Sequence, residues 1–291
     1  MFQKVFCTFP AAFRHVVCCA AATAPSSPLG PKTFSSGRRV HIPAVQHAIL
    51  PSDAARPRTI IIGDIHGCLE ELKALLAACR YDERTTRVVL VGDLVNKGPA
   101  SAECVTFVRT AGFHCVRGNH DDAALFAWEQ RETERQDGGA AEGGSDKYSY
   151  TESFSKEDVE FLASLPHTLR ITQHQVLVVH AGLEPDVALR DQEAAGMITM
   201  RNLLPGGGWT AKHKEGKSWA KAWSPDEKRF PGVAHVVFGH DAKRGLQKHQ
   251  HATGLDTGAC YGKELTALVL PERKIVSVAA GSVYSAPGSG D

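Results

Sequence analysis

The sequence predicts an α/β fold in which a largely parallel sheet carries helices on its faces. Three short apolar runs, at 59–62, 88–91 and 113–116, alternate with two segments in which leucine or valine recurs at helical spacing. The order strand, helix, strand, helix, strand is typical of such a sheet. The runs are continuously apolar, which favours strands buried on both sides.

The helices are placed by their apolar spacing and by capping residues. Leu69, Leu72, Leu75 and Leu76 indicate the first helix, and Ser101 is a candidate N-cap for a second helix through Val108. Ser155, with Asp158 three residues later, matches a capping box that opens a further helix. Between them, residues 131–148 are polar and contain two Gly-Gly pairs, which predicts a mobile loop.

The C-terminal half contains two more buried strand candidates, at 175–179 and 236–238. Residues 206–223 are expected to be irregular. Their tryptophans (Trp209, Trp219 and Trp223) could stack on a nucleobase, but the spacing favours ordinary packing. The apolar runs 265–270 and 275–278 around Pro271 predict a terminal hairpin.

The N-terminal segment differs in composition from the rest of the chain. No acidic residue precedes Asp53, and alanine, serine, proline and basic residues are frequent, as in an organelle transit peptide. We expect a disordered or transit-peptide-like segment over residues 1–57, one folded domain over 58–282 and a disordered tail over 283–291. A cytoplasmic or mitochondrial location follows. Arg14 and His15 interrupt the apolar stretch at 5–23, so no membrane span is expected.

Charge and cysteine content exclude some functions. The formal net charge is +1, whereas general nucleic-acid binding usually needs a strongly basic domain. None of the eight cysteines forms a Cys-x-x-Cys pair, so a zinc knuckle is not expected.

Candidate metal ligands stand at the ends of five apolar runs. They are Asp64 with His66, then Asp93, Asn119, His180 and His240. In open α/β sheets the ligand site lies beyond the carboxyl ends of the strands, so these side chains should meet at one rim.

Six ligands exceed what one catalytic ion needs, but they suit two ions that share a bridging carboxylate and activate a water. Imidazole, carboxylate and amide ligands favour borderline divalent ions. Mn²⁺ is the first choice, and Co²⁺, Fe²⁺ or Zn²⁺ are also compatible. With two aspartates the site would keep about +2 of charge, which attracts a phosphate dianion.

Three blocks of the sequence resemble a known family. They are Gly63-Asp64-Ile65-His66-Gly67, Gly92-Asp93-Leu94-Val95-Asn96-Lys97-Gly98 and Gly118-Asn119-His120-Asp121, and they resemble the signature of the phosphoprotein-phosphatase group of calcineurin-like metallophosphoesterases. Later blocks, including His180-Ala181-Gly182 and Leu255-Asp256-Thr257-Gly258, resemble ApaH-type symmetrical diadenosine tetraphosphate hydrolases. The resemblance covers roughly residues 58–280 and is greatest to the eukaryotic ApaH-like phosphatases.

The resemblance implies a sandwich of two mixed β-sheets flanked by helices, with a dimetal site at the strand C-terminal ends. Asp64, His66 and the bridging Asp93 would hold one ion, and Asp93, Asn119, His180 and His240 the other. His120, with Asn96 beside it, would be the general acid. Lys97, Arg117 and Arg201 would bind the phosphate oxygens.

One pair of residues departs from the pattern of protein phosphatases, which carry Asp-Arg where this chain has Asn96-Lys97. A neutral amide stabilises an imidazolium less than a carboxylate does, and lysine lacks the bidentate fork of arginine. Both changes are compatible with the ApaH-like branch.

The preferred hypothesis is therefore a dinuclear-metal phosphoesterase that hydrolyses phosphoanhydride bonds, as in diadenosine tetraphosphate. A protein serine/threonine phosphatase, a polyphosphatase and an RNA-cap hydrolase remain alternatives, because they use the same bond-breaking groups. Outside the enzymes, the alternative is an inactive phosphate-binding module.

Overall fold

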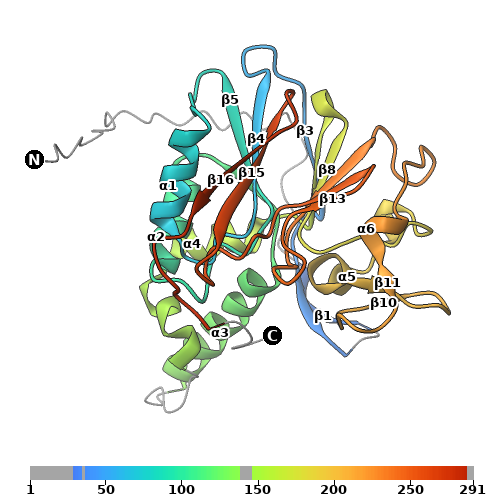
Figure 1. Ribbon diagram of the computed structural model, residues 1–291. Coiled ribbons are helices and arrows are strands. Elements are labelled where there is room, and N and C mark those ends of the chain that lie inside the picture. The colour runs from blue at the N-terminus through green and yellow to red at the C-terminus, as the bar shows by residue number, and fades with distance from the viewer. Residues whose placement is uncertain (1–28, 35–36, 138–145, 287–291) are drawn as a thin grey trace, which may run out of the picture.

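Two mixed β-sheets lie face to face, and helices cover the outer face of each (Figure 1). The computed structural model describes residues 29–34, 37–137 and 146–286. The predicted sandwich flanked by helices is thus confirmed, whereas the sheets are mixed rather than largely parallel.

The first sheet has the strand order β16-β15-β4-β5-β6. Its strands are β4 (Arg58–Ile62), β5 (Thr86–Leu90), β6 (His114–Cys115), β15 (Glu264–Leu270) and β16 (Lys274–Ala279). β4, β5 and β6 run parallel, and β15 pairs antiparallel with β4 and β16. The predicted strands and terminal hairpin of this sheet are confirmed.

The second sheet has the strand order β13-β14-β12-β8-β7-β3. Its strands are β3 (His47–Leu50), β7 (Thr168–Ile171), β8 (Val176–Val179), β12 (His235–Phe238), β13 (Gln247–Lys248) and β14 (Ala252–Gly254). β8, β12 and β14 run parallel, so their carboxyl ends share one edge.

Two small sheets complete the strands. β1 (Leu29–Thr33) pairs with β2 (Arg39–Ile42), and β9 (Asn202–Leu203) lies between β10 (Trp209–Thr210) and β11 (Lys217–Ser218). Residues 206–223, expected to be irregular, contain these two short strands and the short helix α6 (Trp219–Ala222), and are irregular elsewhere.

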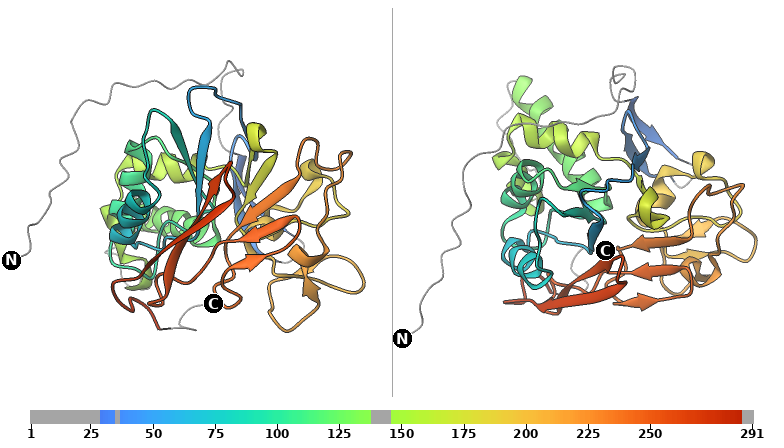
Figure 2. Two further views of the ribbon diagram at one scale, coloured as in Figure 1. Left: turned by 45° about the horizontal axis from the view of Figure 1, so that its top comes forward. Right: turned by 90° about the horizontal axis from the view of Figure 1, so that it is seen from above.

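Four helices lie on the side of the first sheet, and two on the side of the second (Figure 2). The first group comprises α1 (Leu69–Ala78), α2 (Ser101–Thr110), α3 (Asn119–Gln136) and α4 (Lys156–Ser164), and the second α5 (Ala194–Thr199) and α6 (Trp219–Ala222). Three short 3₁₀ helices are η1 (Asp146–Ser153), η2 (Thr172–His174) and η3 (Leu189–Asp191). Ser155 and Asp158 form the predicted capping box at α4.

Alternate residues of the central strands enter different layers of the core. In β4, Ile60 and Ile62 pack under the helices of the first sheet, while Ile61 faces the second sheet. In β8, Val178 faces the first sheet and Leu177 packs against α5 and α6. Burial on both faces explains why these strands are continuously apolar.

The domain boundary predicted at residue 57 is wrong. Val40 and Ile42 of β2 are buried in the core, and β3 pairs in parallel with β7. Each of these strands has only four residues and is flanked by proline and serine, so its sequence resembles that of a loop. The apolar residues against which the strands pack lie far along the chain. Residues 1–28, which carry most of the transit-peptide pattern, lie outside the described residues.

Two further expectations of disorder need correction. Helix α3 continues to Gln136, because Glu, Gln and Arg are strong helix formers and Arg131 pairs with Glu152 of η1 (2.7 Å). In the predicted tail, the Tyr284 hydroxyl donates to Glu71 Oε1 at 2.8 Å. The Gly-Gly pairs at 138–139 and 143–144 and residues 287–291 lie outside the described residues.

Among the helices of the described residues, none is both long enough and apolar enough to cross a membrane.

If β2 belongs to the core, Ile42→Ala should lower the free energy of unfolding by about 2–4 kcal/mol, because it removes buried methyl groups. Ile49→Ala is the matched control, since Ile49 is 56% exposed and Ile42 is 2% exposed. The control should cost about 0.5 kcal/mol or less. Urea denaturation measures both. Equal small losses would show that β2 contributes nothing to the core.

Candidate metal centre and active site

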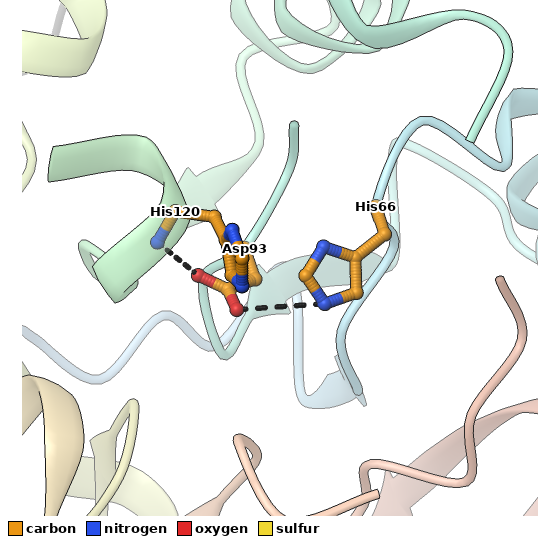
Figure 3. A group of neighbouring side chains, drawn as sticks. All are labelled: His66, Asp93 and His120. Atoms are coloured by element: carbon orange, nitrogen blue, oxygen red, sulfur yellow. Dashed lines mark hydrogen bonds and ion pairs between the residues drawn. The ribbon is translucent and has the colours of Figure 1, made fainter. Parts of the chain in front are cut away.

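The predicted metal ligands follow the carboxyl ends of strands from both sheets. Asp64 and His66 follow β4, Asp93 follows β5, Asn119 opens α3 after β6, His180 follows β8 and His240 follows β12. Ligand atoms of Asp93, His66 and His120 lie within 4.8 Å of one another, and so do those of Asp93, His180 and His240. Figure 3 shows the first group, in which Asp93 accepts the backbone N–H of His120 (2.9 Å) and lies 3.5 Å from His66 Nε2. The Asp93 carboxylate is common to both groups, as expected for a bridging ligand.

The loops that carry these residues have unusual backbone conformations. Five site residues have positive φ, namely His66 (47°), Asp93 (53°), Asn96 (73°), Lys97 (71°) and His240 (67°). Residues other than glycine rarely adopt this region, and such strain is typical of functional sites. Added Cβ atoms at Gly118 and Gly239 would overlap the carboxylates of Asp93 and Asp64, respectively. Glycine is therefore required there by close approach.

Each histidine of the predicted ligand set is oriented by a backbone carbonyl. The donors are His66 Nδ1 to Val95 O (3.0 Å), His180 Nδ1 to Val91 O (2.8 Å) and His240 Nε2 to Thr199 O (3.1 Å). Because a carbonyl can only accept, the other nitrogen of each neutral ring carries a lone pair. Such contacts commonly orient metal-binding histidines.

The arrangement around Asp93 favours a bound cation. His66 Nε2 and His180 Nε2 each lie 3.5 Å from Asp93 Oδ2. Burial lowers the pKa of both rings, that of His180 to about 4, so neither ring brings a proton to the carboxylate at neutral pH. Lone pairs that face a carboxylate repel it unless a positive ion lies between them. The donor set therefore fits divalent cations.

Three buried carboxylates share this region. Burial raises the pKa of Asp93 to about 7 and that of Asp256 to about 6. Burial, followed by the charges of Asp256 and Asp93, raises the pKa of Asp64 well above its usual range. Clustered carboxylates of this kind are stabilised by bound cations.

Asp64 and Asn119 lie beside the two groups of ligand atoms that share Asp93. The Asp64 carboxylate accepts the backbone N–H of His240 at 3.0 and 3.2 Å. Asn119 Oδ1 lies 3.0 Å from His180 Nε2. All six predicted ligands are thus gathered at one site, and their assignment to the two ions remains a prediction.

His120 and Asn96 are in direct contact, as predicted. Asn96 Nδ2 lies 2.9 Å from His120 Nδ1, while Asn96 Oδ1 accepts the N–H of Lys97 at 2.9 Å. With its oxygen engaged, the amide donates to Nδ1 of the neutral ring and leaves the proton on Nε2. Burial, and then the neighbouring His66 and Lys97, lower the pKa of His120 well below its usual range.

Asp121 has a role that the sequence reasoning missed. Its carboxylate accepts the backbone N–H groups of Asp93 (2.8 Å), Leu94 (2.8 Å) and Gly118 (2.9 Å). It therefore joins the loop after β5 to the start of α3. Its place in the first turn of α3, directly after His120, could have indicated this role.

Ser101 is a second such anchor. It was predicted as an N-cap, but Ala100 occupies that position and the Ser101 hydroxyl accepts the N–H of Asn96 at 2.9 Å.

Of the three predicted phosphate-binding residues, Lys97 and Arg201 line the active-site pocket and Arg117 does not. Lys97 Nζ lies 3.4 Å from His66 Nε2. Burial disfavours the charge of Lys97, but Tyr261 and Asp93 outweigh that effect and raise its pKa. Arg201 donates to Ala211 O (3.0 Å) and to His240 O (3.4 Å).

The prediction for Arg117 is contradicted by its position. Its guanidinium is fully buried, donates to His41 O (3.0 Å) and Ala163 O (2.6 Å), and lies 3.6 Å from Asp122 Oδ1. Arg117 therefore lies outside the pocket and links α3 to β2 and α4.

The pocket includes side chains that the sequence did not single out. They are His213, Ala242, Lys243, Tyr261 and Lys263. Asp256, from the block Leu255-Asp256-Thr257-Gly258, also lines the pocket. Trp219 and Trp223 are buried in the core, which confirms packing, and Trp209 Nε1 donates to Glu193 Oε2 (3.0 Å).

Comparisons with known proteins agree with this geometry. The family model for calcineurin-like phosphoesterases matches residues 57–244. A bis(5'-nucleosyl)-tetraphosphatase PrpE (asymmetrical) from Oceanobacillus iheyensis is 25% identical over 241 residues, which cover 78% of this chain and 94% of the relative. A symmetrical bis(5'-nucleosyl)-tetraphosphatase from Aromatoleum aromaticum is 29% identical over 277 residues, covering 76% of this chain and 96% of the relative.

Solved structures show the same fold. One described as a candidate diadenosine tetraphosphatase is 35% identical, has a TM-score of 0.68, and covers 81% of this chain and 98% of its own. A protein serine/threonine phosphatase from Saccharomyces cerevisiae is 16% identical, with a TM-score of 0.53 and 82% and 84% coverage, and shares the fold alone. From its family match and its site, the chain belongs to the calcineurin-like phosphoesterases and is a metal-dependent phosphoesterase.

Proposed function

We propose that this phosphoesterase hydrolyses the phosphoanhydride chain of dinucleoside polyphosphates such as diadenosine tetraphosphate. The contact between Asn96 and His120 carries the proposal. An amide stabilises an imidazolium less than a carboxylate would, so at neutral pH His120 is protonated less often than a histidine paired with an aspartate, as in a protein phosphatase. A departing nucleotide needs little protonation, since its phosphate has a second pKa of about 6, whereas a departing serine alkoxide needs much more. Relatives named as tetraphosphatases support the same substrate class.

The residues of the site have distinct roles in this proposal. Two divalent cations, Mn²⁺ as first choice, would supply the activated water and neutralise the attacked phosphate. Asp93 would lie between the ions, with Asp64 and His66 on one side and Asn119, His180 and His240 on the other. Lys97 and Arg201 would bind the oxygens of the attacked phosphate. His120 lines the pocket and would protonate the departing nucleotide from Nε2.

The substrate class can be tested by a direct comparison. Purified protein with Mn²⁺ or Co²⁺ should hydrolyse diadenosine tetraphosphate with a kcat/KM at least about tenfold above that for a phosphoserine peptide. Analysis of products distinguishes symmetrical cleavage, which gives two ADP, from asymmetrical cleavage, which gives ATP and AMP. Inorganic polyphosphate and capped RNA are further substrates for the same assay. A preference for the phosphopeptide would overturn the proposal.

The Asp93→Asn variant tests the bridging role. It should lose metal-dependent turnover by at least about a thousandfold while keeping its circular-dichroism spectrum, because an amide cannot supply the charge between two cations. Turnover at the parental rate would show that Asp93 does not bridge.

The same variant has a second readout in the metal-free protein. Burial raises the pKa of Asp93 from 3.8 to about 7, so the folded state binds the proton more tightly than the unfolded state. Its ionisation therefore opposes folding as pH rises from about 4 to 7. In EDTA at pH 7.5 the Asn variant should unfold at a temperature no lower than that of the parent.

The Asn96→Asp variant tests the role of His120. A carboxylate at 96 would accept from Nδ1–H and raise the pKa of His120, so the protonated acid would persist to higher pH. The basic limb of the profile of kcat/KM against pH should move upward for diadenosine tetraphosphate. The shift should be larger for a phosphoserine peptide, whose departing alkoxide needs more protonation than a nucleotide does. Asp also tolerates the positive φ of position 96. Identical profiles would show that His120 is not the acid.

A further inference from the structure

Basic side chains gather at the mouth of the active-site pocket, outside the metal ligands. Lys243, Lys263 and His213 all line this pocket, and no role in the reaction has been given to them above. They come from three separate segments, which are the loop after β12, the loop after β14 and the turn between β10 and β11. The pocket is therefore lined by cations beyond those that touch the metal centre.

The loops that carry the two lysines both pass next to Gly258. An added Cβ at Gly258, whose φ is 75°, would lie 3.3 Å from Lys263 Cδ and 3.9 Å from Ala242 Cβ. The stem of Lys263 and Ala242, the neighbour of Lys243, thus both lie next to Gly258. Tyr261, from the same loop, lies under Lys97 Nζ at 5.2 Å from the ring centroid. Lys97, Lys263 and Lys243 all line this one pocket.

The two lysines at the mouth form no ion pair within the described part of the chain. Lys243 and Lys263 are exposed, and neither ammonium group forms an ion pair or hydrogen bond with any described residue. The nearby acid, Asp241, is buried and engaged, since it accepts from Arg244 Nη1 at 2.6 Å and lies 3.5 Å from His213 Nδ1. His213 Nε2, in turn, has no hydrogen-bond partner among the described residues.

Lys97 and Arg201 are placed differently from the two exposed lysines, because they lie at the inner end of the pocket. Lys97 Nζ contacts His66, and Arg201 is held by the carbonyls of Ala211 and His240. Both lie directly against the predicted metal ligands, where only the attacked phosphate would be within reach. The pocket thus has an inner pair of cations at the reacting centre and an outer pair at the mouth.

We propose that Lys243 and Lys263 form a second phosphate subsite, which binds the phosphates next to the attacked one in a polyphosphate chain. This inference rests on the proposed function and deepens it. A polyphosphate carries negative charge on every phosphate along its length, whereas a monoester ends at the reacting phosphate and leaves the outer lysines without a partner. Lysine suits this task because its flexible ammonium can follow a mobile chain.

The Lys243→Gln/Lys263→Gln double variant tests the subsite. Its kcat/KM for diadenosine tetraphosphate, divided by that for p-nitrophenyl phosphate, should fall about tenfold, or about threefold for each exposed charge removed. The fall should appear mainly in KM for the tetraphosphate. That KM should also rise less steeply with added salt than in the parent, because part of the screened attraction is gone.

The Lys217→Gln/Lys248→Gln double variant is the matched control. Both lysines are exposed, lie outside the pocket lining and carry the same total charge. The control should keep the parental ratio. A fall of equal size in the control would assign the effect to net charge and overturn the subsite, as would an unchanged ratio in the test variant.

A binding measurement separates this inference from the proposed function. The Kd of a methylene-bridged diadenosine tetraphosphate analogue, measured by calorimetry on the metal-loaded protein, should rise about tenfold in the test variant and stay constant in the control. If the parent fails to hydrolyse the natural tetraphosphate, the proposed function fails, yet this measurement still decides the subsite. An unchanged Kd would overturn it.

Discussion

The Asp93 carboxylate is buried where the carboxyl ends of both sheets meet, and the site is organised around its charge. Asp64 and Asp256 lie in the same buried region, and burial raises the pKa of all three carboxyl groups. Histidines whose other nitrogens are held by carbonyls present lone pairs to Asp93. Carboxylates and lone pairs buried together repel one another, and divalent cations between them would replace this repulsion by attraction. Metal binding and the stability of this region are therefore coupled.

The geometry around that charge is held by backbone contacts. Asp121 accepts three N–H groups from two loops, and Ser101 holds the backbone of Asn96. These bonds maintain the left-handed conformations of Asp93 and Asn96. Preorganised loops of this kind place ligands before the ions arrive, which reduces the ordering required on binding.

Helix α3 connects the N-terminal strands to the chemistry. Its first turn carries Asn119 and His120, and its next residues are held from behind by Arg117 and by His41 of β2, whose Nδ1 lies 3.3 Å from Asp122 Oδ1. A strand about eighty residues upstream therefore supports the position of His120. The pocket in front of this helix is lined by inner cations at the metal ligands and by outer lysines, on which the proposed second phosphate subsite rests.

The sequence by itself determined the central strands, the helices α1, α2 and α4, and the six candidate ligands, because continuous apolar runs and the residues at their ends are local patterns. It misplaced Arg117, which follows the same strand as Asn119 but whose side chain is buried against α3, outside the pocket. It also assigned β2 and β3 to a disordered segment, and overlooked Asp121, Lys243 and Lys263. These features depend on partners distant in the chain, such as β7 for β3 and the β5 loop for Asp121. Only the tertiary structure decides which side chains enter the pocket, since packing determines where a long side chain can extend.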